Sequence, residues 1–273
     1  MNNILIKILG CGASVGCPIT GCDCNVCKST NLKNNRTRTS LFIQYNYTNI
    51  LVDSGPDLRQ QMLRENISHI DKVLYTHKHA DHVVGMDDLR SSFFYRKDIL
   101  DVYGNYETLN HCYNNFKYLF KSIDYANQGS RVFFEADNDF PKKSLFGHIL
   151  SNYESFNING LKIQTFQQHH GRIHSAGYLL PDYHFAYSTD VHEFPQESIE
   201  LLKNAKLKTW IISLTLKEGN DAHMSFEKIK FYNEIVKSER LIFTHMGHFI
   251  DYDDRSYLEE NMSFGYDGMI VSV

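Results

Sequence analysis

The segment Thr76 to His82, with the sequence THKHADH, places three imidazoles and one carboxylate within six consecutive positions. It directly follows an apolar run that is typical of a strand. One residue separates His77 from His79, so both side chains can point the same way from an extended chain. Imidazole and carboxylate ligands together suit zinc, manganese, iron or cobalt. We therefore predict a metal pair at this segment, with Asp81 and His82 facing the second ion.

This run resembles the HxHxDH signature of the metallo-β-lactamase superfamily, whose members hold two metals at the top of an αβ/βα sandwich. The resemblance implies an α/β fold of four layers, in which two mixed β-sheets face each other with helices outside. It also implies a third histidine on the first metal, a bridging aspartate and a further histidine on the second metal. His170, Asp190 and His245 occur in this order, each near the end of a predicted strand. His169 is an alternative to His170 as the third histidine of the first metal. The glycine after His170, Gly171, favours His170.

Two further residues take their roles from the same resemblance. Asp53 follows the apolar run Ile50 to Val52, and it would accept a hydrogen bond from a ligand histidine and so fix the tautomer of that ring. His223 matches, by its distance from His245, an additional histidine of the phosphodiesterase and tRNA-processing branches. We assign His223 as a general acid or phosphate clamp. The alternative is a structural neighbour of the helix predicted to begin at Ser225.

A cluster of thiols predicts a separate metal site. Cys22, Cys24 and Cys27 lie in a stretch rich in Gly, Asn and Thr that shows no apolar periodicity. The vicinal Cys22 and Cys24 are poorly placed for a mutual disulfide, whereas close thiols suit structural zinc, which needs a fourth ligand. We predict His248 as that ligand, because one short segment with His245 could then serve a catalytic metal and a structural zinc. Reduced cysteines in a flexible loop are the alternative.

The CxCxxC motif combined with the later HxxH resembles the carbon–phosphorus lyase accessory cyclic phosphodiesterases, which are related to tRNase Z. The implied function is a binuclear metal-dependent hydrolase acting on a small cyclic or nucleotide-like phosphodiester. Two divalent ions, zinc or manganese, would hold a bridging hydroxide that attacks phosphorus, with Asp81 among the catalytic residues. Arg90, and Arg172 or His174, are candidates for contacting the substrate phosphate. A surface ion pair is the alternative for Arg90.

Composition and patterning indicate how the chain is organised. No linker rich in Pro, Gly or Ser divides the 273 residues, so we expect one domain over 1–273, with a zinc-knuckle loop at about 17–30. Residues 104–159 lack a firm period and suggest an insertion. Apolar runs predict strands at 4–9, 41–45, 50–52, 72–76, 99–103, 161–166, 176–180, 184–189, 209–214, 240–244 and 268–273. Helical spacing predicts helices at 56–65, 107–120, 195–202 and 225–236.

Charge and hydropathy bear on the partners. The apolar run Ile4 to Leu9 is interrupted by Lys7 and ended by Gly10, which is too short for a signal core or a membrane span. We expect a cytoplasmic protein that does not bind membranes. A formal net charge of −4 supplies no general attraction for nucleic acid. The family resemblance implies a homodimer.

Two alternative functions share these motifs. A tRNA 3′-processing endonuclease would use the same metal ligands and the additional histidine, but it would carry a basic arm rich in Gly and Pro that this sequence does not show. A cofactor-biosynthesis oxidoreductase of the pyrroloquinoline-quinone type also bears a CxCxxC zinc knuckle but departs from the full ligand set. The complete set therefore favours hydrolysis, and it also argues against a non-catalytic metal-binding protein.

Overall fold

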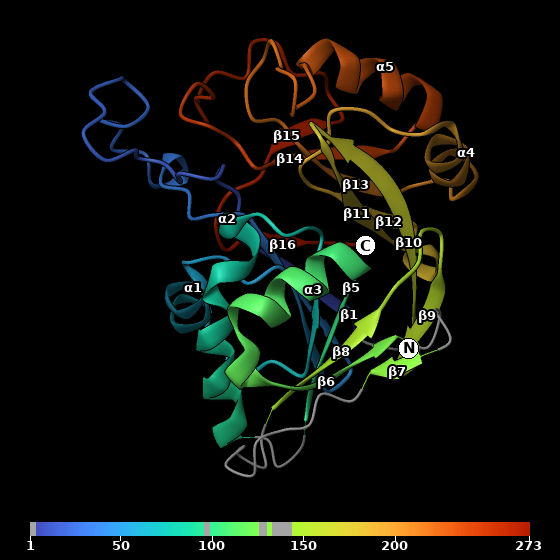
Figure 1. Ribbon diagram of the computed structural model, residues 1–273. Helices are drawn as coiled ribbons and strands as arrows, with labels where there is room; N and C mark the ends of the chain where they lie inside the picture. The colour runs from blue at the N-terminus through green and yellow to red at the C-terminus, as the bar shows by residue number, and fades with distance from the viewer. Residues whose placement is uncertain (1–3, 96–98, 126–129, 133–143) are drawn as a thin grey trace.

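A computed structural model describes residues 4–95, 99–125, 130–132 and 144–273. Two β-sheets face each other across a shared apolar core, and helices cover their outer faces (Figure 1). The predicted α/β sandwich of two mixed sheets with helices outside is therefore confirmed. In this part of the chain no helix combines the length and the apolar character that a membrane span requires.

The first sheet has nine strands in the order β16-β1-β2-β3-β4-β5-β8-β6-β7. Parallel pairing begins at β3–β4 and continues through β5, β8 and β6. The strands are β1 (Ile4–Gly10), β2 (Ser40–Tyr45), β3 (Thr48–Val52), β4 (Lys72–Leu74), β5 (Leu100–Gly104), β6 (Phe120–Tyr125), β7 (Ser130–Val132), β8 (Leu145–Ile149) and β16 (Ile270–Val271).

The second sheet has seven strands in the order β15-β14-β13-β12-β11-β10-β9. The strands β12 to β15 are parallel, whereas β10 and β11 form a long antiparallel hairpin. The strands are β9 (Ser155–Ile158), β10 (Leu161–His170), β11 (Ile173–Leu180), β12 (Phe185–Ser188), β13 (Thr209–Ser213), β14 (Arg240–Thr244) and β15 (Met262–Phe264).

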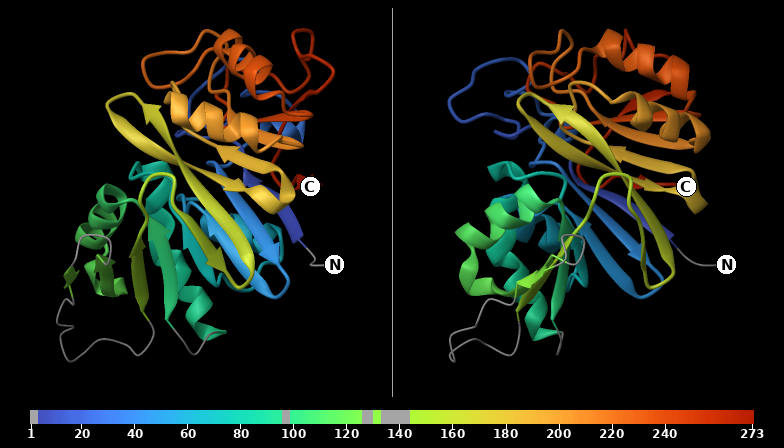
Figure 2. Two further views of the ribbon diagram at one scale, coloured as in Figure 1. Left: turned by 90° about the vertical axis from the view of Figure 1, so that its right-hand side faces the viewer. Right: turned by 45° about the vertical axis from the view of Figure 1, so that its right-hand side comes forward.

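Helices form the outer layers, as the two turned views show (Figure 2). Asn105 caps α3 through the backbone N–H of Thr108, and Ser225 caps α5 through that of Lys228, so each helix begins where a side chain satisfies a free N–H. The helices are α1 (Leu58–Arg64), α2 (Ala80–Val83), α3 (Tyr106–Asn115), α4 (Gln196–Asn204) and α5 (Phe226–Val236), with 3-10 helices η1 (Leu32–Asn34), η2 (Val84–Phe94), η3 (Lys117–Leu119) and η5 (Pro181–Tyr183).

The central strand β3 of the first sheet is buried on both faces, because its alternate residues enter different cores. In β3, Ile50 packs into the core between the sheets, whereas Leu51 packs against α1, η2 and α3. Successive side chains of a strand point to opposite faces, so two apolar clusters follow from one apolar run. Predicted apolar runs match β1 to β5, β10 to β14 and β16, whereas the short strands β6 to β9 and β15 were not predicted.

Residues 104–159, for which we predicted an insertion, contribute to both sheets where the structure describes them. They form α3, β6, β7, β8 and β9, and β8 lies between β5 and β6. Residues 126–129 and 133–143 of this region lie outside the described residues. The segment 11–39, blue in Figure 1, leaves the end of β1 and extends along one side of the molecule.

Candidate metal centre

The candidate centre lies where parallel strands of both sheets end. The histidine motif begins two residues after β4, and Asp53 directly follows β3. In the second sheet, His170 is the last residue of β10, His245 directly follows β14, and Asp190 lies two residues after β12. Because the carboxyl ends of parallel strands meet at one edge of a sheet, residues far apart in the sequence converge there.

Three histidines form the first group of ligand atoms. His79 Nδ1 lies 3.0 Å from His77 Nε2 and 3.2 Å from His170 Nε2. His169 and His170 are consecutive residues of β10, so their side chains face opposite sides of the hairpin. The ring of His169 instead lies 4.9 Å from the ring of His174, its partner on β11. The structure thus turns His170 toward the site and His169 away from it.

The second group combines carboxylates and imidazoles. Asp81 Oδ2 lies 3.3 Å from His82 Nε2 and 3.4 Å from His245 Nε2. Asp190 lies between the two groups: its Oδ2 is 3.1 Å from His82 Nε2, and its Oδ1 is 3.3 Å from His245 Nε2 and 3.6 Å from His170 Nε2. One carboxylate can therefore reach both groups, which is the position predicted for a bridging ligand.

Each inward-facing Nε2 is oriented by a contact on the other side of its ring. His82 Nδ1 donates to Asp53 Oδ2 at 2.8 Å, and His170 Nδ1 donates to the carbonyl of Ala222 at 2.8 Å. The Nδ1 atoms of His77 and His245 lie 3.0 Å from the hydroxyls of Thr76 and Thr215. Such partners fix the ring tautomer and leave Nε2 free to bind a metal. Sequence reasoning identified Asp53 but missed Thr76, Thr215 and Ala222.

Three of these positions have a left-handed backbone conformation. Asp53, Asp190 and His245 have φ angles of +63°, +52° and +51°, in the left-handed region that residues other than glycine rarely adopt. Each of the three follows a strand end and carries a polar side chain into the site. Strain of this kind persists where the surrounding structure enforces it, and it is common at functional sites.

Burial and mutual contact set the protonation of the group. Burial lowers the pKa of His77 well below its usual value. Burial would also lower the pKa of His82, but Asp190 and Asp53 raise it well above the usual value. Burial would raise the pKa of Asp190, but His245 and His82 hold it well below. Burial would also raise the pKa of Asp81, but hydrogen bonds with His245 and His82 lower it. Asp81 and Asp190 are therefore ionised, which is the form of a carboxylate that binds metals.

His223 lies beside the same group and is partly exposed. Its Nδ1 is 3.9 Å from Asp190 Oδ1, and its ring lies 5.0 Å from that of His170 and 5.2 Å from that of His245. Asn220, which sequence reasoning missed, accepts a hydrogen bond from the His223 backbone at 2.8 Å. Burial lowers the pKa of His223 to about 4, so its imidazole is neutral at pH 7.

The donor set fits a pair of divalent cations. It supplies imidazole nitrogens and two ionised carboxylates in overlapping groups whose atoms lie within 4.8 Å of one another, and such ligands suit first-row divalent metals. The Nε2 of His82 is buried and lies 3.1 Å from Asp190 Oδ2 and 3.3 Å from Asp81 Oδ2, yet it forms no well-aligned hydrogen bond with any described residue. A buried polar atom without a partner is costly, and coordination of a cation would satisfy it.

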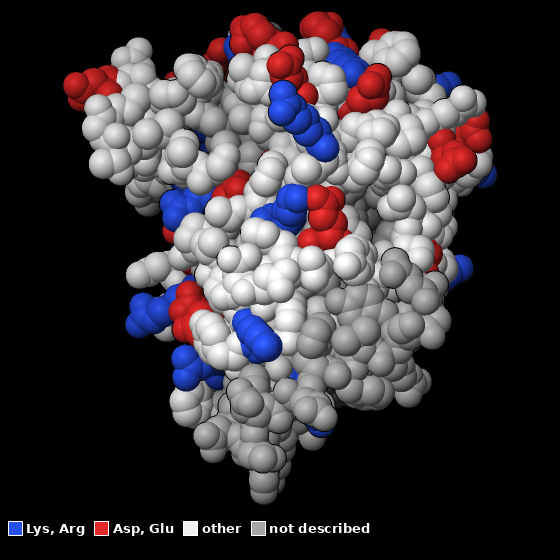
Figure 3. Space-filling model, in the orientation of Figure 1, with Lys and Arg blue, Asp and Glu red and all other residues white. Residues whose placement is uncertain are grey.

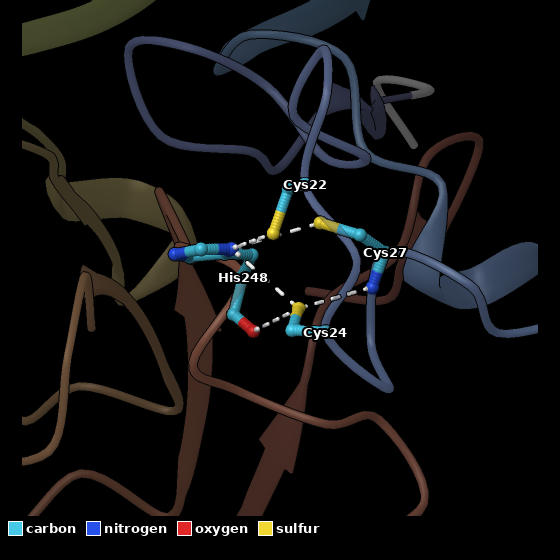
Figure 4. A group of neighbouring side chains, drawn as sticks. All are labelled: Cys22, Cys24, Cys27 and His248. Carbon is cyan, nitrogen blue, oxygen red and sulfur yellow. Dashed lines mark hydrogen bonds between the residues drawn. The ribbon is translucent and has the colours of Figure 1, made fainter.

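The predicted thiol site is a compact tetrad on the segment 11–39 and the loop after β14 (Figure 4). His248 Nδ1 lies 3.2 Å from the sulfur of Cys22 and 3.6 Å from the sulfurs of Cys24 and Cys27. The backbone N–H of Cys27 contacts Cys24 Sγ at 3.4 Å and lowers the pKa of that thiol. Three sulfurs and one imidazole nitrogen match the donors of a tetrahedral zinc site.

The remaining predicted contacts lie elsewhere. Arg90 on η2 pairs with Asp87 at 3.4 Å and lines a cavity of about 550 Å³ between α1 and η2, whose lining includes none of the ligand residues. His174 is exposed and faces the same side of the β10–β11 hairpin as His169. Arg172 is exposed in the turn of that hairpin. The structure brings neither Arg90 nor His174 to the candidate centre.

Comparisons with known proteins identify the family and the fold. Residues 48–246 match the family model described as the beta-lactamase superfamily domain. The structure is similar to the crystal structure of a diphosphatase from the PhnP family, with a TM-score of 0.85, 28% identity and coverage of 99% of this chain and 97% of that one. The short form of human tRNase Z shares the fold, with a TM-score of 0.67, 17% identity and coverage of 98% and 99%.

One relative carries a different name. The chain is 32% identical over 266 residues to a protein from Porphyromonas gingivalis named octanoyltransferase. The match covers 96% of this chain and 50% of that protein. The chain thus spans about half the length of this relative.

Proposed function

The chain belongs to the beta-lactamase superfamily, and on that premise we propose that it is a binuclear metal-dependent phosphodiesterase acting on a small cyclic or nucleotide-like phosphodiester. One observation carries the proposal: Asp190 lies within 3.1 to 3.6 Å of His82, His245 and His170, so it joins two ligand groups into one centre. The diphosphatase of the PhnP family, similar over nearly the whole chain, supports phosphorus as the reacting centre.

We assign the ligands of the metal pair as follows. His77, His79 and His170 would hold the first ion, and Asp81, His82 and His245 the second, with Asp190 shared between them. Divalent cations at these positions would acidify a bound water and offset negative charge on the phosphoryl oxygens. The protein itself contributes rigid placement, because Asp53, Thr76, Thr215 and the Ala222 carbonyl orient the four Nε2 atoms.

His223 would bind the substrate phosphate from the open side of the centre. Its Nδ1 is buried and forms no hydrogen bond within the described part of the chain, and its side chain keeps 13% of its surface exposed. A neutral imidazole can donate one hydrogen bond to a phosphoryl oxygen. We therefore favour the phosphate clamp over the general acid for His223.

Surface charge is consistent with a small substrate. On the described part of the face in Figure 3, basic and acidic side chains are interspersed, without an extended basic surface. An RNA substrate would be favoured by clustered lysines and arginines that contact the phosphate backbone. This supports a small phosphodiester ahead of tRNA.

We assign the octanoyl transfer named for the Porphyromonas relative to the half of that protein that this chain does not match. The observations behind this assignment are that the match covers 50% of that protein and that this chain, which forms the matched part, carries the candidate metal ligands. An octanoyl-transfer assay on this chain is expected to show no activity. Transfer by this chain alone would overturn the assignment.

The test measures whether the metal-loaded protein hydrolyses bis(p-nitrophenyl) phosphate, a 2′,3′-cyclic nucleotide and inorganic diphosphate. The first substrate has a good leaving group, which needs no proton, and the second has a poor one. A phosphate clamp predicts that His223→Ala lowers kcat/KM about a hundredfold on both diesters, and that His223→Gln recovers part of the loss. A loss confined to the cyclic nucleotide would identify a general acid instead. Turnover of no phosphorus substrate by the loaded wild type would overturn the function.

A further inference from the structure

One short segment carries ligand atoms of two different clusters. His245 Nε2 faces Asp81 at 3.4 Å and Asp190 at 3.3 Å in the candidate centre. Three residues later, His248 Nδ1 faces the cysteine sulfurs at 3.2 to 3.6 Å. Any movement of residues 245–248 therefore alters both clusters at once.

This segment is held on both sides by backbone hydrogen bonds. The Met246 N–H donates to the Cys11 carbonyl at 2.7 Å, and the Ala13 N–H donates back to the Met246 carbonyl at 3.1 Å. The Gly247 N–H donates to the Thr215 carbonyl at 3.0 Å, while the Thr215 hydroxyl contacts His245 Nδ1 at 3.0 Å. A Cβ atom at Gly247 would lie 2.7 Å from the Thr215 carbonyl oxygen, so the packing leaves no room for a side chain at this position.

A buried arginine ties this segment to the loop that carries the thiols. Arg36 is only 2% exposed, and its guanidinium donates to the carbonyls of Gly247 at 3.0 Å and Ile250 at 2.6 Å. The backbones of Arg36 and Cys17 exchange two hydrogen bonds, of 2.7 and 2.9 Å. Cys17 begins the stretch that leads to Cys22. Arg36 thus connects the residues after His245 to the loop that carries Cys22, Cys24 and Cys27, which we call the thiol loop.

From these contacts, together with the ligand assignment under Proposed function, we propose that the cysteine site and the second catalytic metal site are thermodynamically coupled through residues 245–250. Zinc at Cys22, Cys24, Cys27 and His248 anchors this segment and so positions His245 toward Asp81. His248 and Arg36 act as positioning residues. A coupling of this kind is reciprocal, because each ligand changes the affinity of the other by the same factor.

The coupling is selective for the second metal. The histidines of the first group are oriented from other parts of the chain, since His77 contacts Thr76 and His170 donates to Ala222. Neither of these contacts involves residues 245–250 or the thiol loop. Loss of the cysteine site should therefore weaken one catalytic metal and spare the other.

The first experiment measures Mn²⁺ binding by electron paramagnetic resonance, because Mn²⁺ prefers nitrogen and oxygen donors to thiolates. Cys24→Ser is compared with Cys112→Ser, which removes a buried thiol of α3 far along the chain. We expect Cys24→Ser to weaken one of the two Mn²⁺ binding steps about fivefold or more and to leave the other step unchanged within about twofold. In Cys112→Ser, both steps should be unchanged within the same limit. Two unchanged steps in Cys24→Ser, or two equally weakened steps, would overturn the coupling.

The reciprocal experiment does not depend on folding of the cysteine variant. His245→Asn removes the shared catalytic ligand, and asparagine tolerates the positive φ of this position. Competition with a chromophoric chelator should show weaker zinc binding at the cysteine site, by the same factor, whereas His79→Asn leaves it unchanged. Equal zinc affinity in the two variants would refute the proposal. If the wild type bound no Mn²⁺, the proposed function would fail. If it bound two Mn²⁺ ions and Cys24→Ser left both steps unchanged, only the coupling would fail.

Discussion

Asp53 and His82 form a hydrogen bond of 2.8 Å between Oδ2 and Nδ1, and both side chains are completely buried. Asp53 also accepts hydrogen bonds from the backbone N–H and the hydroxyl of Thr76, each at 2.8 Å. One carboxylate therefore holds both ends of the histidine motif. Burial raises the pKa of Asp53, so its charge depends on these three donors.

Replacing Asp53 with asparagine should weaken the second metal site. Asparagine keeps the size and tolerates the positive φ, but it accepts the His82 proton less strongly and can favour the wrong tautomer. Metal affinity is expected to fall by about 10- to 100-fold, as measured by competition with a chelator. Asp57→Asn, which lies outside the ligand groups and pairs with Arg38, serves as the control. Equal affinities in the two variants would contradict the role of Asp53.

His169 and His170 provide a matched pair for the first metal site. His170→Ala removes a ligand nitrogen, so we expect the loss of one metal ion per chain and a decrease of kcat of at least about a hundredfold. His169→Ala removes a ring on the other side of the hairpin and should keep the wild-type metal content. Elemental analysis of both variants decides between them. Loss of metal from His169→Ala alone would reverse the assignment.

Arg90→Ala should leave turnover unchanged within about twofold. The Arg90 side chain is 61% exposed and pairs with Asp87, and such surface ion pairs contribute about 0 to 1 kcal/mol to stability. Steady-state kinetics on a cyclic nucleotide, with a thermal melt as a folding control, measure both effects. A tenfold increase in KM without loss of stability would place Arg90 at the substrate after all.

The lowered pKa of Asp101, at the other end of the first sheet, predicts that part of the stability of the fold is lost in acid. Burial would raise its pKa, but contacts with His148 and Lys72 lower it below its usual value. A carboxylate with a lowered folded-state pKa stabilises the fold above the unfolded value of about 3.9, and this contribution disappears as pH falls through the folded value.

Asp101→Asn is therefore expected to reduce the free energy of unfolding by about 1 kcal/mol at pH 7 and to have no effect at strongly acidic pH. Urea unfolding of chelator-treated protein at several pH values tests this, because chelation removes the contribution of the metals. The same destabilisation at every pH would show that Asp101 acts through packing and not through its charge.

Local sequence patterns were sufficient to predict clusters of ligands that lie close together in the chain. The motif from His77 to His82 and the cysteines from Cys22 to Cys27 bring their ligands together through short spacing, which needs little knowledge of the rest of the chain. Apolar runs such as Ile50 to Val52 also identify central strands, since burial on both faces demands continuous apolar residues. Short edge strands such as β9, which is partly exposed, carry no comparable signal.

The sequence by itself determined which residue types could bind metal and which strands would carry them. Only the tertiary structure decided that His170 and not His169 faces the site, that Thr215 and Ala222 orient the ligands, and that Arg90 lies at a separate cavity. The physical reason is that side-chain direction depends on strand register, and hydrogen-bond partners here come from segments 30 to 52 residues away along the chain. Such long-range contacts form only when the two sheets pack together.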